Sequence, residues 1–235
     1  MKNKDIVINF ERRLQVMFPE LLEEKPSSDL ILQYINDAIN RFVTTRFTGM
    51  NYKLKSFEQD QKRIDDLRTL VKSQFYTFDK YDDPSIDGIS LPGDYMFLLG
   101  EQASITSDDK CWPIVNGKPI VKTTDVLEAT IENIDKQRAN HLSEHLLHAN
   151  TARPLRLIKG NSVYLYTDGN YTIVRYDIDY LRKPSKVTLE SPMSEYTDLT
   201  DTVMHEVINI AVTMYLADKG DQRYNVAQNE VQLME

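Results

Sequence analysis

In the segment PLRLIKGNSVYLYTDGNYTIVRYDIDYLRKP, residues Pro154 to Pro184, apolar and polar side chains alternate over most of the length, as is typical of β-strands. Two tight turns divide it, at Lys159-Gly160-Asn161 and at Asp168-Gly169-Asn170. Glycine favours the positive φ that such hairpin turns require. The segment therefore predicts a meander of three short antiparallel strands that ends at Arg182-Lys183-Pro184.

The last strand of this meander should present two different faces, because successive side chains of a strand point to opposite sides. One face is expected to carry Thr172, Val174, Tyr176, Ile178 and Tyr180, and the other Tyr171, Ile173, Arg175, Asp177 and Asp179.

Helices are predicted on both sides of the β-rich region. Apolar residues at helical spacing indicate helices over residues 4–24, 29–47, 56–72 and 198–219. Pro26-Ser27-Ser28-Asp29 is typical of a helix start, and Gly220 of a helix end. Between the third and fourth of these helices, a strand is expected over residues 95–106 and a hairpin around Asn116-Gly117. Residues 124–148 have mixed patterns that suggest two short helical pieces.

The order of these elements predicts an α+β fold with two lobes. A helical bundle would form from residues 1–75 together with 196–235, and residues 76–195 would form an inserted antiparallel β-domain. The loops at 79–90, 107–118 and 167–170 are polar and long enough to reach neighbouring molecules. Residues 221–235, polar and sparsely apolar, are expected to be mobile in the isolated chain and ordered in an assembly.

Composition and charge exclude several classes of protein. The chain has 235 residues, one cysteine and a net charge of −8. A single cysteine excludes a disulfide-stapled scaffold, and no apolar run approaches the roughly 20 residues that span a bilayer, so no membrane partner is expected. The net negative charge opposes tight binding to nucleic acid backbones.

No catalytic motif is present, so the sequence predicts no enzyme, no catalytic residues, no cofactor and no metal site. One pattern leaves an alternative open: His141, His145 and His148, with Glu144 nearby, would share a face if this segment were helical and could then bind Zn²⁺. A metal-dependent enzyme that uses this cluster is therefore the alternative from another class.

Three weaker candidates have simpler interpretations. Asp177 and Asp179 could hold Mg²⁺, but Arg175 on the same face favours a charge-balanced strand surface. Cys111 has no candidate base near it in sequence. Basic residues interleaved with aromatic residues over 156–183 leave open a nucleic-acid-binding accessory protein, although acidic segments flank them.

Several sequence blocks occur in a familiar order. After the early helices come LPGDYMFL, WPIV, TTD and NTARPLRL, then the tyrosine-rich meander, DYLRKP at residues 179–184 and LTDTVMHEVINIAV at residues 199–212. From about Asp29 to Ala217 the chain resembles head-to-tail connector (adaptor or ring) proteins of tailed double-stranded DNA phages, particularly short-tailed crAss-like phages.

This resemblance implies a structural virion protein that forms a ring, commonly of twelve copies, in the portal-to-tail connector. It also implies contacts with the portal protein and with neighbouring tail or ring proteins. Genomic DNA would pass through the channel that the ring lines without being bound specifically, which an acidic chain favours. The expected location is the virion, assembled in the cytoplasm of the bacterial host.

Overall fold

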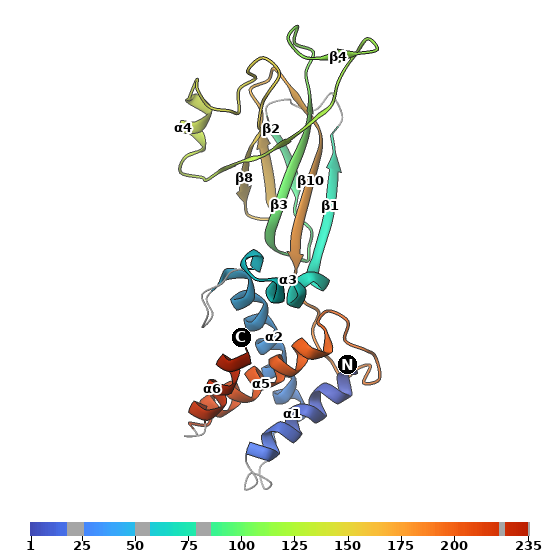
Figure 1. The fold of residues 1–235 in the computed structure, drawn as a ribbon, viewed down its shortest axis with the longest axis vertical. Coiled ribbons are helices and arrows are strands. Elements are labelled where there is room, and N and C mark those ends of the chain that lie inside the picture. The colour runs from blue at the N-terminus through green and yellow to red at the C-terminus, as the bar shows by residue number, and fades with distance from the viewer. Residues whose placement is uncertain (18–25, 50–56, 79–85, 221–223, 235) are drawn as a thin grey trace. The chain divides into compact units, whose positions relative to one another are not determined.

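A computed structural model describes residues 1–17, 26–49, 57–78, 86–220 and 224–234 (Figure 1). The fold is α+β with antiparallel sheets, as the sequence predicts. The chain divides into a helical unit, Met1–Leu70 with Pro184–Glu235, and a β unit, Val71–Lys183. No helix among the described residues is both long and apolar enough to cross a membrane.

The helical unit contains α1 (Asn3–Met17), α2 (Ser28–Thr48), α3 (Gln61–Leu67), α5 (Asp201–Asp218) and α6 (Tyr224–Met234), with 3₁₀ turns at Phe57–Gln59 and Arg68–Leu70. α5 packs against α1, α2 and α6. Its apolar neighbours on α2 repeat at helical spacing and are buried: Ile31, Ile35, Ala38, Ile39, Phe42 and Val43. The predictions of α2, its cap at Ser27 and the helix end near Gly220, which has φ 66°, are confirmed.

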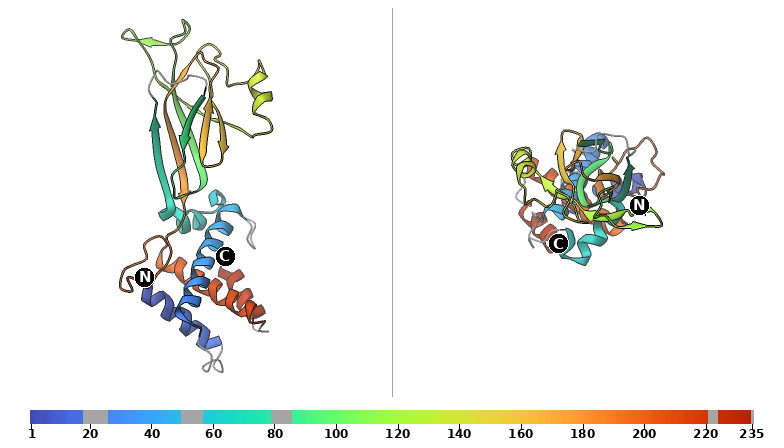
Figure 2. Two further views of the ribbon diagram at one scale, coloured as in Figure 1. Left: turned by 180° about the vertical axis from the view of Figure 1, so that it is seen from behind. Right: turned by 90° about the horizontal axis from the view of Figure 1, so that it is seen from above.

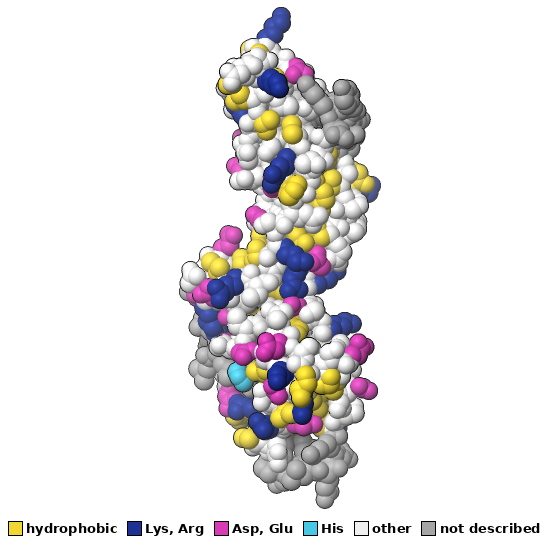
Figure 3. All heavy atoms as spheres, turned by 90° about the vertical axis from the view of Figure 1, so that its right-hand side faces the viewer, with side chains coloured by type: hydrophobic (Ala, Val, Ile, Leu, Met, Phe, Trp, Pro, Cys, Tyr) yellow, Lys and Arg dark blue, Asp and Glu magenta, His cyan; other side chains and the backbone are white. Residues whose placement is uncertain are grey.

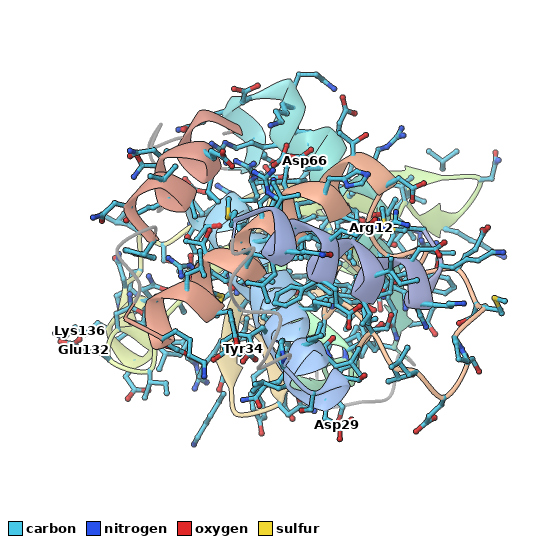
Figure 4. The ribbon with its side chains drawn as sticks, turned by 90° about the horizontal axis from the view of Figure 1, so that it is seen from below. Arg12, Asp29, Tyr34, Asp66, Glu132 and Lys136 are labelled. Atoms are coloured by element: carbon cyan, nitrogen blue, oxygen red, sulfur yellow. The ribbon has the colours of Figure 1, made fainter. Side chains whose placement is uncertain are left out.

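A group of charged side chains lies between α2, α3 and α5. The Arg46 guanidinium is 2.6 Å from Glu206 and 3.4 Å from Asp66, and Lys62 contacts Glu206 at 2.9 Å. Burial raises the pKa of Asp66, which Figure 4 labels, although Arg46 opposes that shift. These ion pairs connect α2 with α3 and α5.

One prediction for the helical unit differs from the structure. The helix expected over 56–72 ends at Leu67, and Val71 already begins a strand; the capping Ser56 lies outside the described residues. α1 ends at Met17, and residues 18–24 lie outside the described part. The described part of the tail forms α6, which contacts α5, buries Ala227 and pairs Glu230 with Arg13. The expected mobility of the tail in the isolated chain and its ordering in an assembly stay predictions.

Residues 184–200 belong to the helical unit, whereas the order of elements in the sequence predicts residues 184–195 as part of the β-domain. The Asn36 side chain holds this segment by accepting from the Val187 amide at 2.8 Å and donating to its carbonyl at 3.2 Å. The Asp198 carboxylate accepts from both the amide and the hydroxyl of Ser185. These side chains replace the strand pairing that the segment lacks.

The β unit has two four-stranded sheets (Figures 1 and 2). The first sheet has the order β1 (Val71–Thr77), β10 (Thr172–Arg182), β3 (Tyr95–Thr106) and β6 (Lys122–Asp125). The second has β2 (Ile86–Ser90), β9 (Ser162–Tyr166), β8 (Leu155–Lys159) and β7 (Leu127–Ala129). All neighbours are antiparallel except β7 and β8. β4 (Ile114–Val115) and β5 (Lys118–Pro119) form a separate hairpin, and α4 spans Ile134–Ala139.

The two sheets share one apolar core. It contains Ala103 and Ile105 from β3, Ile173, Tyr176, Ile178 and Tyr180 from β10, and Val163 and Leu165 from β9. A smaller cluster, Ala129, Ile134 and Leu155, packs α4 against the second sheet. Each sheet therefore packs one face into the shared core, and α4 packs against the second sheet as well.

The predicted meander is wrong in its pairing. β8 and β9 form a hairpin, but β10 lies in the other sheet, between β1 and β3. Asp168 directs this change of sheet, because its carboxylate accepts from the Leu147 amide at 2.7 Å and the Asn170 amide at 2.9 Å. The turn therefore carries the chain across the sandwich.

The predicted faces of β10 are also only partly right. The pairing with β3 shifts between Ile173 and Arg175, which marks Val174 as the extra residue of a β-bulge. Ile173 therefore points into the core, as Tyr176 does, while Arg175, Asp177 and Asp179 remain on the outer face. The strand at 95–106 is confirmed as β3.

A buried charge should disrupt the helical unit. Ile35 on α2 and Val207 on α5 are fully buried, so we expect Ile35→Asp and Val207→Asp each to lower the free energy of unfolding by about 3–5 kcal/mol. Urea unfolding followed by circular dichroism measures this loss. Val226→Asp, at an exposed position of α6, is the matched control and should change little; equal stability of all three variants would contradict this packing.

Candidate interaction surface

The hairpin β4–β5 forms at the Asn-Gly turn that the sequence predicts. Asn116 has φ 51° and Gly117 has φ 76°, the positive values that a two-residue hairpin loop needs. Ile114 pairs with Pro119 and Val115 with Lys118. The hairpin contributes no strand to either sheet of the sandwich, so its stability comes from how its base is held.

Trp112 holds that base. Its ring is buried in the core of the β unit, and its Nε1 donates to the Ile120 carbonyl at 2.8 Å. The Ile120 amide donates to the Pro113 carbonyl at 3.0 Å, which closes the two arms of the hairpin. Lys122 places its ammonium 5.0 Å from the centre of the Trp112 ring. The hairpin is therefore rigidly attached to the sandwich.

Next to its polar Asn116-Gly117 turn, the hairpin carries two exposed apolar residues on β4, Ile114 and Val115, which are called the hairpin tip. Ile114 is 62% exposed and Val115 is 58% exposed, and Val121 just beyond β5 is exposed as well. Burying such side chains would contribute about 1.5–3 kcal/mol each, yet the fold holds them in solvent on a fixed support. Preorganised apolar residues of this kind are typical of protein–protein contact sites.

A second exposed surface is the outer face of the first sheet. Residues that face each other across antiparallel strands point to the same side, so the register places Phe75, Asp177, Gln102 and Asp125 in one row across all four strands. The neighbouring row on one side contains Ser73, Asp179 and Gly100, and that on the other Thr77, Arg175, Ser104 and Thr123. The face is charged and lined with small residues, and β1 is its edge.

Phe75 and Arg175 form a cation–π pair on this outer face. Phe75 is 57% exposed, and the Arg175 guanidinium lies 4.4 Å from the centre of its ring. Two nitrogens of Arg175, Nε and Nη2, donate to the Asp177 carboxylate at 2.5–2.9 Å, which fixes the guanidinium in place. Aromatic and arginine side chains are enriched among the residues that dominate binding energy at interfaces. Figure 3 views the side of the β unit on which β1 lies.

The structure confirms that Asp177 and Asp179 belong to a charge-balanced strand surface, since Asp177 pairs with Arg175 and Asp179 accepts from the Ser73 hydroxyl. The basic side chains of 156–183 do not form one patch, because Arg156 is buried and Arg175 is paired on the outer face. The sequence does not predict the contact between Phe75 and Arg175. These residues are 100 positions apart and meet only because β1 pairs with β10.

The histidine segment is not helical. Residues 141–148 form turns, and Leu142, expected on a buried side, is 87% exposed. His145 is instead buried, and burial lowers its pKa. Among the residues that the structure describes, no group of three or more His, Cys, Asp or Glu side chains is placed to hold a metal ion. The three imidazoles therefore lack the shared helical face on which the predicted zinc site depended.

Two of the loops proposed from the sequence lie together. Thr106–Asp109 and Gly169–Thr172 line an open cavity of about 270 Å³, and the Ser107 hydroxyl joins them by donating to the Asn170 carbonyl at 2.6 Å. Cys111 is exposed, with its amide bound to the Asp109 carboxylate. The loop residues 79–85 lie outside the described residues, and Ile86–Ser90 form β2.

The strongest buried electrostatic interaction of the β unit joins its two sheets. Arg156 on β8 lies 2.9 Å from Glu101 on β3, and the Tyr176 hydroxyl on β10 donates to the same carboxylate at 2.6 Å. Burial raises the pKa of Glu101, opposed by Tyr176 and Arg156. A perturbed carboxyl can mark an active site; Glu101 is not among the residues that line the cavity described above.

Comparison with models of known protein families and with curated proteins finds no match to this chain. The proposed function therefore rests on the surfaces described above.

Removal of Arg156 should destabilise the β unit in a pH-dependent way. Arg156→Met leaves Glu101 buried without its cation, so the free energy of unfolding should fall by about 3–5 kcal/mol at pH 7.5. A carboxyl with a raised pKa in the folded state binds protons more tightly when folded. Stability of the variant should therefore increase as pH falls from 7.5 toward 5, because the raised pKa of Glu101 lets the folded state take up a proton more readily than the unfolded state.

Urea unfolding at both pH values measures this difference. Arg138→Met, at an exposed position of α4, is the control and should show a small loss at either pH. A loss for Arg156→Met that stays constant across this range would show that Glu101 does not carry the effect.

Proposed function

We propose that this chain is a structural subunit of a ring in the portal-to-tail connector of a tailed phage, with no catalytic activity. The observation that carries the proposal is the hairpin β4–β5, whose apolar tip is held in solvent by a buried tryptophan. Exposed apolar side chains on a fixed support are suited to contact with another protein rather than to catalysis. The resemblance of the sequence to head-to-tail connector proteins supplies the kind of assembly.

The finer architecture of the proposal is a helical bundle made from both ends of the chain, with the β-domain inserted between them. The bundle would give the subunit its rigid body, since Arg46, Asp66 and Glu206 connect three of its helices. The β-domain would supply contacts to neighbours through its hairpin and its outer face. Twelve copies would surround the DNA channel, with the portal protein and other ring or tail proteins as partners.

DNA contact in this proposal is weak and independent of sequence. The chain carries 36 acidic residues against 28 lysines and arginines, and a polyanion moves past an acidic lining without being held. The Arg156 and Arg175 side chains are engaged by Glu101 and Asp177, which further reduces the positive charge available to phosphates.

Quantitative mass spectrometry of purified virions, from the phage whose genome encodes this chain, tests the proposal. We expect about twelve copies per particle, as the resemblance implies, and the portal protein serves as an internal standard. A chain that is produced during infection and missing from particles would contradict the proposal.

Substitution of the hairpin tip should prevent incorporation without unfolding the chain. Val115→Asp places a charge at a contact that we expect to be buried in the assembly, so copies per particle should fall by at least about tenfold, the effect of roughly 1.4 kcal/mol. Thermal unfolding of the purified variant should be nearly unchanged, because the tip is exposed.

Leu142→Asp is the matched control. It changes an apolar residue of the same unit that is more exposed than Val115, and it should leave both copy number and melting temperature unchanged. Full incorporation of the Val115→Asp variant would show that the tip is not a contact.

A further inference from the structure

We propose that the hairpin tip of one copy docks on the outer face of the first sheet of the next copy, over Phe75 and Arg175. This inference rests on the proposed ring and names the surfaces that would close it. The two surfaces are different parts of the same chain, so each copy has one hairpin to give and one face to receive. Heterologous contacts of this type generate rings when their rotation closes.

Apolar complementarity supports this pairing. Ile114 and Val115 at the tip are exposed, and Phe75 is the large exposed apolar residue of the outer face, with Val71 on the same strand also exposed. The residues beside Phe75 are small, Ser73 and Gly100 in one neighbouring row and Thr77 and Ser104 in the other. A protruding tip can therefore approach the sheet closely around a rigid aromatic anchor.

Charge complementarity identifies a second copy as the partner. The segment 110–122 contains Lys110, Lys118 and Lys122 and no carboxylate. Of these, Lys122 is engaged by the Trp112 ring and the Asn150 carbonyl. The outer face presents the carboxylates of Asp125, Asp177 and Asp179, of which Asp177 is paired with Arg175 and Asp125 lies 3.9 Å from Arg153. Lys118, an exposed residue of β5 next to the turn, would approach Asp179 or Asp125.

The alternative symmetric contacts are disfavoured by the same charges. Two hairpin tips brought together would oppose Lys118 to Lys118, and two outer faces would oppose their carboxylates. Like charges at an interface cost free energy, while opposite charges fix register. The hairpin and the outer face are therefore complementary to each other and not to themselves.

Cysteine cross-linking in assembled particles tests the contact. In a Cys111→Ser background, Val115→Cys and Phe75→Cys together should give a ladder of chain multimers after mild oxidation of purified virions, because a disulfide forms only when Cα atoms lie within about 7 Å. Leu142→Cys combined with Phe75→Cys, in the same background, should give no ladder. Melting temperatures of the purified variants show that each chain folds.

A charge exchange provides an independent test. Lys118→Glu and Asp179→Lys should each reduce copies per particle by about fivefold, and the double variant should recover to within about twofold of the unmodified chain, because the attraction is restored with its sign reversed. Additive losses in the double variant would overturn the pairing of these two residues.

The outcomes separate the inference from the function on which it rests. Particles that contain the double-cysteine chain at normal copy number and give no ladder would overturn the docking of the tip on this face and leave the ring intact. Absence of the unmodified chain from particles would overturn the ring itself.

Discussion

The ion pair between Glu101 and Arg156 is the interaction on which the β unit depends. It joins the two sheets inside an apolar core, and the Tyr176 hydroxyl completes the carboxylate's hydrogen bonds. A shift of either sheet by one residue would leave a buried charge unpaired, at a cost of several kcal/mol. The pair thus fixes the position of β3 and β10, and with it the outer row of Phe75 and Asp177 and the start of the loop that carries Trp112.

Local patterns predicted the elements well because their causes are local. Residues 95–106 form a strand, Asn116-Gly117 a hairpin turn and residues 28–48 a helix, each by its own side chain spacing or backbone conformation. The errors concern long-range pairing. In sequence, Asp168-Gly169 resembles a hairpin turn. Whether such a turn returns the chain to the same sheet depends on which strands pair with one another, and that pairing is not local. The bulge at Val174 depends in the same way on the register with β3.

The candidate site was less predictable than the fold. The hairpin could be found from its turn, and the sequence placed the 107–118 loop among its interaction loops. The outer face could not, because Phe75 and Arg175 meet only through the pairing of β1 with β10. The histidine pattern failed for a related reason: three imidazoles at helical spacing share a face only in a helix, and residues 141–148 form turns. The helix of the tail was not predicted, because its burial at Ala227 depends on contact with α5.

The exposed surfaces are small, which constrains how a ring can form. One tip on one face buries little apolar area against an association cost of about 4–15 kcal/mol, and a net charge of −8 makes copies repel one another. Isolated pairs are therefore expected to be weak. In a closed ring each copy makes two such contacts, and the last copy gains both at the entropic cost of one binding event. The rigid support of the hairpin by Trp112 reduces that cost further, because the tip loses little conformational freedom on docking. In the proposed ring, weak pairs and a stable closed assembly would both follow from the same surfaces, and the free chains would stay apart until a complete ring could form.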